Sequence, residues 1–234
     1  MKYYNDCPNC GSSNPLFKLT CGNCKTFLRA KVTNIDFGSI LWQLMEEPKK
    51  AFIKIIQAEH KNFTIPTLLA VTLKISLTIQ IISNIILAKH SEVSTFFLSL
   101  GVTYLISIII FLFLPFLIKL LGKIFKREYR YKDILTIITF SFVPMLISLI
   151  IFVPLEFALF GAYWFLFNPP PTLIKPIPSF ILFFFEFCFF AWNLILMVIS
   201  QNRLYDKKWI SIIATTIFFS LLFGGSILTN LFLF

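Results

Sequence analysis

The sequence predicts an all-α integral membrane bundle of five transmembrane helices with a small cysteine-bearing head at its N-terminus. Apolar residues make up 57% of the 234 and charged residues only 14%. The apolar residues fall into five runs, each of about the 20 residues that cross a bilayer. Four cysteines stand within the first 24 residues, ahead of every run. A soluble domain of this length does not need so much apolar sequence for its core.

The cysteines form two C-x2-C pairs in the segment CPNCGSSNPLFKLTCGNC. They are Cys7, Cys10, Cys21 and Cys24. Gly11 follows the first pair and Gly22 lies within the second, where tight turns bring two thiols onto one ion. This spacing is typical of a zinc ribbon, in which the metal supplies folding energy that so small a segment lacks. We therefore predict a structural Zn²⁺ held by the four thiolates.

Two other interpretations of the cysteines are disfavoured. A thioredoxin-like redox pair requires a βαβ context, which this segment lacks. A catalytic metal requires an open coordination position, and four thiolates close the tetrahedron. Thiols stay reduced in the cytosol, so the head is expected on the cytosolic side.

The predicted units are a zinc ribbon at residues 1–30, an amphipathic juxtamembrane connector at 31–62 and a membrane domain at 63–234. The five spans are expected at about 64–87, 94–121, 134–160, 177–200 and 209–234.

Positive charge separates the loops into two sets, and this asymmetry sets orientation. Basic residues crowd the segment before the first span and the loops at 122–133 and 201–208. The loop residues are Lys123, Lys126, Arg127, Arg130, Lys132, Arg203, Lys207 and Lys208. The opposite loops hold only Lys89 and Lys175. The expected topology is a cytosolic N-terminus and an outside C-terminus, in a prokaryotic plasma membrane. The net charge of +10 is explained by basic residues that lie beside anionic lipid, so we expect no nucleic-acid partner.

Pro48 separates two short amphipathic helices in the connector. Their apolar residues at helical spacing are Phe37, Ile40, Leu41, Leu44, Met45, Phe52, Ile55 and Ile56. Two placements are open: along the inner membrane surface, or packed beneath the bundle.

Four polar residues within the spans form a candidate intramembrane site, because burying such groups is costly. They are Lys74, Gln80, Glu186 and Asn193. Lys74 and Glu186 lie near mid-membrane, so an ion pair is one hypothesis. The second hypothesis is that Lys74 snorkels, with its ammonium reaching the cytoplasmic end of the span about 16 Å away. The helical angle favours this hypothesis, because it points Lys74 away from the face that carries Gln80. Glu156 lies close to the outer interface, where we expect it to be solvated.

Three segments resemble the Yip family, the Ypt/Rab-interacting membrane proteins. They are EEPKKAF at 46–52, YKDILTIITFSFVPMLIS at 131–148 with Pro144 inside the third span, and WNLILMVISQNRLYDKKWISIIA at 192–214. The resemblance implies five spans and a cytosolic N-terminus, and its eukaryotic members act with Rab GTPases in vesicle traffic. This chain lacks their Asp-Leu-Tyr-Gly-Pro segment and carries a zinc ribbon instead, as prokaryotic members do.

The leading functional hypothesis is a non-enzymatic scaffold or adaptor that contacts membrane lipids and binds a protein partner through its ribbon and basic loops. The alternative is a small transporter or channel that uses the intramembrane polar residues. An intramembrane enzyme ranks third, because only His60, His90 and lone Cys188 offer reactive groups and no catalytic motif is visible. Small residues in the fifth span would also permit a homo-oligomer: Thr215, Thr216, Ser220 and Gly224.

Overall fold

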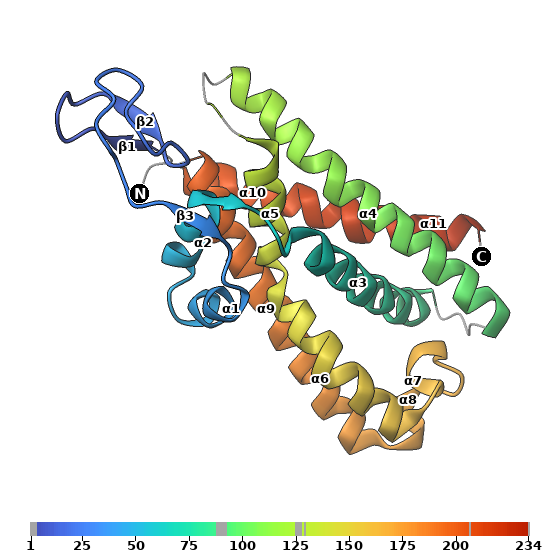
Figure 1. The fold of residues 1–234 in the computed structure, drawn as a ribbon. Helices are drawn as coiled ribbons and strands as arrows, with labels where there is room; N and C mark the ends of the chain where they lie inside the picture. Colours follow the sequence, from blue (N-terminus) through green and yellow to red (C-terminus); the bar gives the residue numbers. More distant parts are fainter. Residues whose placement is uncertain (1–3, 88–92, 125–127, 129, 206, 234) are drawn as a thin grey trace.

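The structure is a computed structural model that describes residues 4–87, 93–124, 128, 130–205 and 207–233. Among these residues, five helical segments are long and apolar enough to cross a membrane. They are Thr64–Ile86, Thr95–Leu120, Val143–Phe160, Pro176–Tyr205 and Lys208–Phe232. The predicted fold class, a helical bundle with five spans, is therefore confirmed (Figure 1). Lys89, His90, Lys126 and Arg127, named above, lie outside the described residues.

Two pairs of short strands lie at the N-terminal end of the chain. Strands β1 (Tyr4–Asp6) and β2 (Ser13–Pro15) form an antiparallel hairpin in the ribbon. Strands β3 (Val32–Asn34) and β4 (Ala58–His60) pair in parallel. The second pair was not predicted, and it ties the two ends of the connector to each other.

The connector contains the two predicted helices, α1 (Phe37–Glu46) and α2 (Pro48–Gln57). The Asp36 side chain accepts from the Ser39 amide to begin α1, and Pro48 occupies the first turn of α2, where its missing N–H has no helical role. The apolar residues of α2 are buried against α5 and α9, so this helix packs on the bundle. On α1, Trp42 and Met45 remain exposed.

The membrane domain consists of longer helices joined by short ones. Their bounds are α3 (Thr64–Ile86), α4 (Val93–Ile124), α5 (Tyr131–Ser141), α6 (Val143–Phe160), α7 (Tyr163–Leu166), α8 (Pro171–Ile174), α9 (Pro176–Tyr205), α10 (Lys208–Phe219) and α11 (Gly225–Leu233). One π-helical turn, η1 (Ser220–Gly224), joins α10 to α11.

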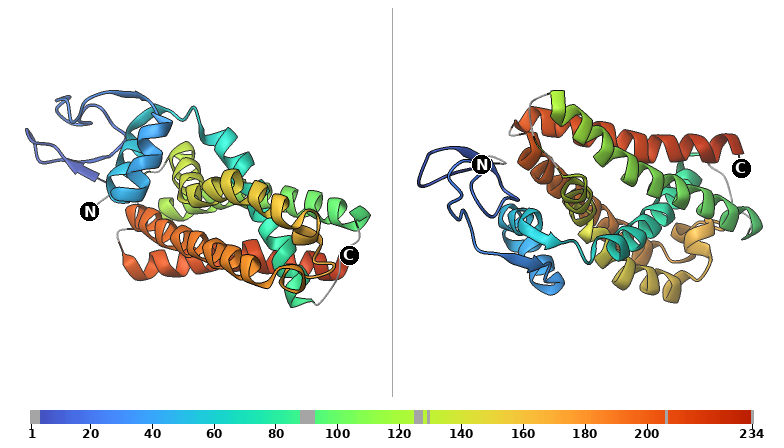
Figure 2. Two further views of the ribbon diagram at one scale, coloured as in Figure 1. Left: turned by 90° about the horizontal axis from the view of Figure 1, so that it is seen from below. Right: turned by 45° about the horizontal axis from the view of Figure 1, so that its top comes forward.

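The predicted third span is two helices rather than one. It divides at Phe142, two residues before Pro144, into α5 and α6. Proline lacks an N–H and crowds the preceding turn, which accounts for a break at this point. The chain changes direction here, and α6 then runs beside α9 away from α4 and α11 (Figures 1 and 2). Helix α3 lies between the two groups and contacts both α4 and α6.

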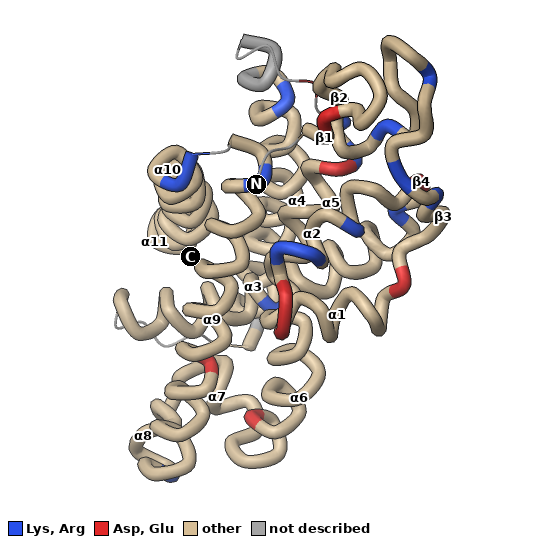
Figure 3. The backbone as a smooth tube through the Cα atoms, turned by 90° about the vertical axis from the view of Figure 1, so that its left-hand side faces the viewer, with Lys and Arg blue, Asp and Glu red and all other residues tan. Residues whose placement is uncertain are grey.

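Apolar side chains cover the outside of the spans, as expected for helices that face lipid. Examples are Ile109, Phe113, Phe116, Ile150, Phe184 and Phe187. Charged residues gather instead on the ribbon, α2 and the ends of the helices near them (Figure 3).

Aromatic rings fill the bundle where α5 gives way to α6. Phe142 lies 5.1 Å from the ring of Phe111 on α4 and 5.7 and 5.4 Å from those of Phe218 and Phe219 on α10. Phe111 and Phe142 are wholly buried. The residue at which α5 ends and α6 begins is therefore packed against both α4 and α10.

We predict that Phe111→Ala lowers the stability of the protein by about 3 kcal/mol, because the ring leaves a cavity among Phe142 and Phe218. Phe113→Ala is the control, since this residue of the same helix is 55% exposed to lipid. Thermal unfolding of both variants in detergent measures the difference. Equal midpoints would show that the aromatic cluster does not hold the bundle together.

Candidate metal centre and intramembrane ion-pair cluster

The two cysteine pairs adopt matching turns. The amide of Gly11 donates to the Cys7 carbonyl, and the amide of Lys25 donates to the Cys21 carbonyl. Both residues have a left-handed backbone, with φ of 71° and 64°. Glycine accepts this conformation readily and lysine does not. The two knuckles are thus built alike, and the tight turn of the second falls at Lys25 rather than at Gly22.

All four thiol sulfurs lie within 4.8 Å of one another. The Sγ atoms of Cys7 and Cys24 are 3.5 Å apart, and those of Cys10 and Cys21 are 3.6 Å apart. Four sulfurs around one Zn²⁺ at about 2.3 Å would stand about 3.8 Å from each other. The four cysteines could therefore hold one metal ion, and their geometry fits tetrahedral zinc.

The surroundings of Cys21 favour a thiolate. A contact with the Ser12 hydroxyl at 3.0 Å, together with the backbone of Cys24, lowers the pKa of Cys21 to about 5. The Asn14 amide nitrogen lies 3.5 Å from the same sulfur and also approaches the backbone oxygen of Ser12. Donors of this kind orient metal ligands from outside the coordination sphere.

A second cluster joins the ribbon to the bundle, and we call Arg29, Lys61, Arg130 and Asp133 the polar clamp. The buried Asp133 carboxylate accepts from Arg130 at 2.8 and 2.9 Å and lies 3.1 Å from the Lys61 ammonium. Burial lowers the pKa of Lys61, and Asp133 opposes this shift. Lys61 also donates to the carbonyls of Ile55 and Ala58. The clamp therefore fixes the end of α2 against the start of α5.

Two arginines extend the clamp to the ribbon. Arg29 donates to the carbonyls of Phe17 and Gln57, at 2.9 Å in each case. The guanidinium of Arg130 lies 4.5 Å from the centre of the Phe17 ring, within cation–π range. This arrangement was not predicted, and its one signal in the sequence is Asp133, an acid at the end of a strongly basic loop.

Lys74, Glu186 and Glu156 form a buried cluster between α3, α9 and α6. The Lys74 ammonium lies 2.8 Å from Oε1 of Glu186 and 3.9 Å from Oε2 of Glu156. The Ser148 hydroxyl donates to Oε1 of Glu186 at 2.5 Å. Lys74 is only 1% exposed, so it does not snorkel, and the expectation that Glu156 is solvated is wrong because its side chain is wholly buried. The fold of α6 back onto α3 encloses both groups.

Gln80 belongs to a separate network of neutral groups. Its amide donates to Thr103 at 3.0 Å and accepts from Ser99 at 2.9 Å. The Ser99 oxygen also lies 2.7 Å from the amide oxygen of Asn230, and the amide nitrogen of Asn230 donates to Ser83. These bonds join α3, α4 and α11. The sequence singles out Gln80 but does not reveal its partners on α4 and α11.

Asn193 lies apart from both groups. Its side chain is buried on α9, and neither its oxygen nor its nitrogen has a hydrogen-bond partner in the part of the chain that the structure describes. The four predicted polar residues thus lie in three separate places. Lys74 and Glu186 are together, whereas Gln80 and Asn193 each lie elsewhere.

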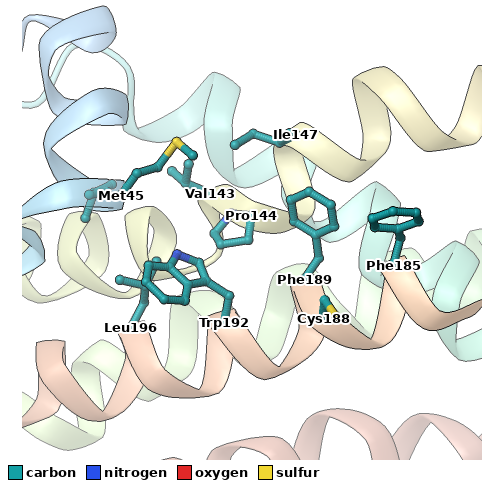
Figure 4. A pocket seen from close by; sticks show the side chains of 10 residues that line it. Met45, Val143, Pro144, Ile147, Phe185, Cys188, Phe189, Trp192 and Leu196 are labelled. Carbon is teal, nitrogen blue, oxygen red and sulfur yellow. The ribbon is translucent and has the colours of Figure 1, made fainter.

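Two residues of the motifs noted in the sequence share an apolar pocket of about 420 Å³. Pro144 from α6 and Trp192 from α9 line it, with Met45 of α1 nearby (Figure 4). Cys188 lies in the same wall as a lone exposed cysteine. The pocket marks the place where the helix break meets α1 and α9.

We predict that Cys21→Ser removes the bound metal, because three thiolates cannot close the tetrahedron. Elemental analysis of the purified protein should fall from one zinc per chain to well below one. Cys188→Ser is the control and should keep the full content, since Cys188 lies in the membrane domain. Full metal content in Cys21→Ser would show that the four-cysteine site is not the ligand set.

Comparison with known proteins identifies the family of the membrane domain. The family model of the Yip1 domain matches residues 42–228. No curated protein and no solved structure gives a significant match. The match extends from α1 to α11. It includes the break at Phe142, the clamp residue Asp133, the Lys74 cluster and the Gln80 network. This five-span integral membrane protein belongs to the Yip1 domain family.

Proposed function

We propose that this protein is a non-enzymatic membrane adaptor, whose zinc-bound ribbon is a rigid docking platform on the cytosolic face. The observation that carries this proposal is the polar clamp. A ribbon on a free tether would need no contact with the spans. Here Arg29 and Arg130 bind it to Gln57 and Ile56 at the end of α2 through their carbonyls. The platform therefore has a defined place relative to the bilayer.

The assignment of zinc rests on the four thiolates and their tetrahedral spacing. Bound metal would supply the folding energy of the ribbon, since the buried apolar residues among residues 4–30 are only Cys7, Pro15, Leu16 and Cys21. A closed four-thiolate site leaves no position for substrate. The ion is thus structural in this proposal.

The cytosolic orientation of the ribbon is supported by two independent arguments. Reduced cysteines persist in the cytosol, and the basic residues lie at the same end of the bundle as the ribbon (Figure 3). Positively charged residues beside the spans would also hold this end against anionic lipid headgroups.

The ribbon offers an apolar anchor for a protein partner. Phe27 is 76% exposed, and it follows the second knuckle. Exposed Lys25 and Lys31 flank it along the chain. An aromatic anchor with a charged rim is the composition of many binding hot spots, and the positive charge favours an acidic partner.

We predict that a photo-crosslinking amino acid at position 27 captures one discrete protein in living cells, because Phe27 contacts the partner directly. Immunoblots for shifted bands measure the capture. The same crosslinker at position 113, which faces lipid, is the control and should give no such band. Adding Cys10→Ser should abolish the product, since the platform unfolds without its metal. An unchanged product in a membrane-inserted, metal-free variant would contradict the adaptor role of the ribbon.

A further inference from the structure

The intramembrane cluster holds more negative charge than positive. Two carboxylates, Glu156 and Glu186, face one ammonium, that of Lys74. Neither oxygen of Glu156 has a hydrogen-bond partner among the residues that the structure describes. An uncompensated carboxylate is strongly disfavoured in a low-dielectric interior. This cost is relieved either when a proton binds one of the two carboxylates or when one further positive charge enters the cluster.

The carboxylate available to a ligand is that of Glu186. Its side chain is 14% exposed, whereas that of Glu156 is wholly buried. Glu186 and Lys74 both line a cavity of about 300 Å³ between α3, α7 and α9. A cation that enters this cavity meets Glu186 first.

The walls of the cavity suit an organic cation. Trp164, Phe183, Phe187 and Phe190 supply aromatic rings, and Trp164 stacks on Phe183 with centroids 4.7 Å apart. Ring faces attract quaternary and alkyl ammonium groups. The remaining lining residues are mostly aliphatic, whereas hard metal ions require several oxygen ligands. The cluster beside the cavity has two acidic groups and one basic group, which disfavours an anion.

We propose that this cavity binds a hydrophobic ammonium compound, either free or as the choline headgroup of a lipid, with its charge on Glu186. Lys74 stands between the two carboxylates, so it can move from Glu186 to Glu156 when the ligand arrives. A shift of about 1 Å suffices, since a charge-assisted bond is about 2.8 Å long. The exchange gives every carboxylate of the cluster a positive partner.

The test uses a pair of probes that differ only in charge. Benzyltrimethylammonium carries a permanent cation, and neopentylbenzene replaces its nitrogen with carbon. Equilibrium dialysis against the full-length protein in detergent, with protein-free micelles subtracted, measures both. We expect one site that binds the cation at least tenfold more tightly than the neutral isostere. Equal binding of the two probes to the wild-type protein would overturn the proposal, with no variant needed.

Variants then locate the site. Glu186→Gln leaves Lys74 paired with Glu156, so the cluster becomes neutral and cation binding should fall at least tenfold. Glu59→Gln, at the exposed end of the connector, is the control and should bind as wild type does. Unchanged cation binding in a folded Glu186→Gln protein would place the ligand elsewhere and refute the assignment.

Lipid composition distinguishes the two sources of the ligand. In nanodiscs of phosphatidylcholine, choline headgroups would compete and weaken probe binding relative to nanodiscs of neutral digalactosyldiacylglycerol. Equal binding in both would identify a free cation as the ligand of the same site. Absence of saturable cation binding in both would refute the site.

Discussion

The buried Asp133 carboxylate is the point on which the arrangement of the head, the connector and the bundle depends. It forms ion pairs with Lys61, near the end of the connector, and with Arg130, the residue directly before α5. Both cations also bond to carbonyls at the end of α2. Removing one member of a buried ion pair leaves an uncompensated charge and costs about 3–5 kcal/mol. The acid therefore adds a charged link between the connector and α5 to the apolar packing of α2 on the bundle.

Inside the membrane, two polar systems of different chemistry divide the spans. The neutral Gln80 network joins α3 to α4 and α11, whereas the Lys74 cluster joins α3 to α6 and α9. Helix packing in lipid gains little from the hydrophobic effect, so such interhelical bonds select which helices are neighbours. Helix α3 takes part in both systems, which explains why it is the most buried of the five spans. The break at Phe142 is what brings α6 close enough for the second system to form.

Much of this fold could be predicted from the sequence because apolar run length and cysteine spacing are local signals. The spans, the two connector helices and the four-cysteine cluster are of this kind. Contacts between distant segments were less accessible. Helical angle on α3 correctly separated Lys74 from Gln80, but it could not show that α6 folds back and buries Glu156. The burial of Glu156 depends on the path of the chain after Pro144. The pairing of β3 with β4 and the contacts of Asp133 depend on how the segment after the ribbon folds, which helical angle does not show.

Hydrogen–deuterium exchange of an Asp133→Asn variant tests most directly whether this one carboxylate couples the ribbon to the spans. Asparagine keeps the size of the side chain but removes the charge that Lys61 and Arg130 require. At unchanged metal content, the amides of residues 16–31 should exchange at least tenfold faster than in the wild type, while those in the middle of α3 should not change. Wild-type exchange rates throughout the ribbon would contradict the account, because the ribbon would then be held by something other than the clamp.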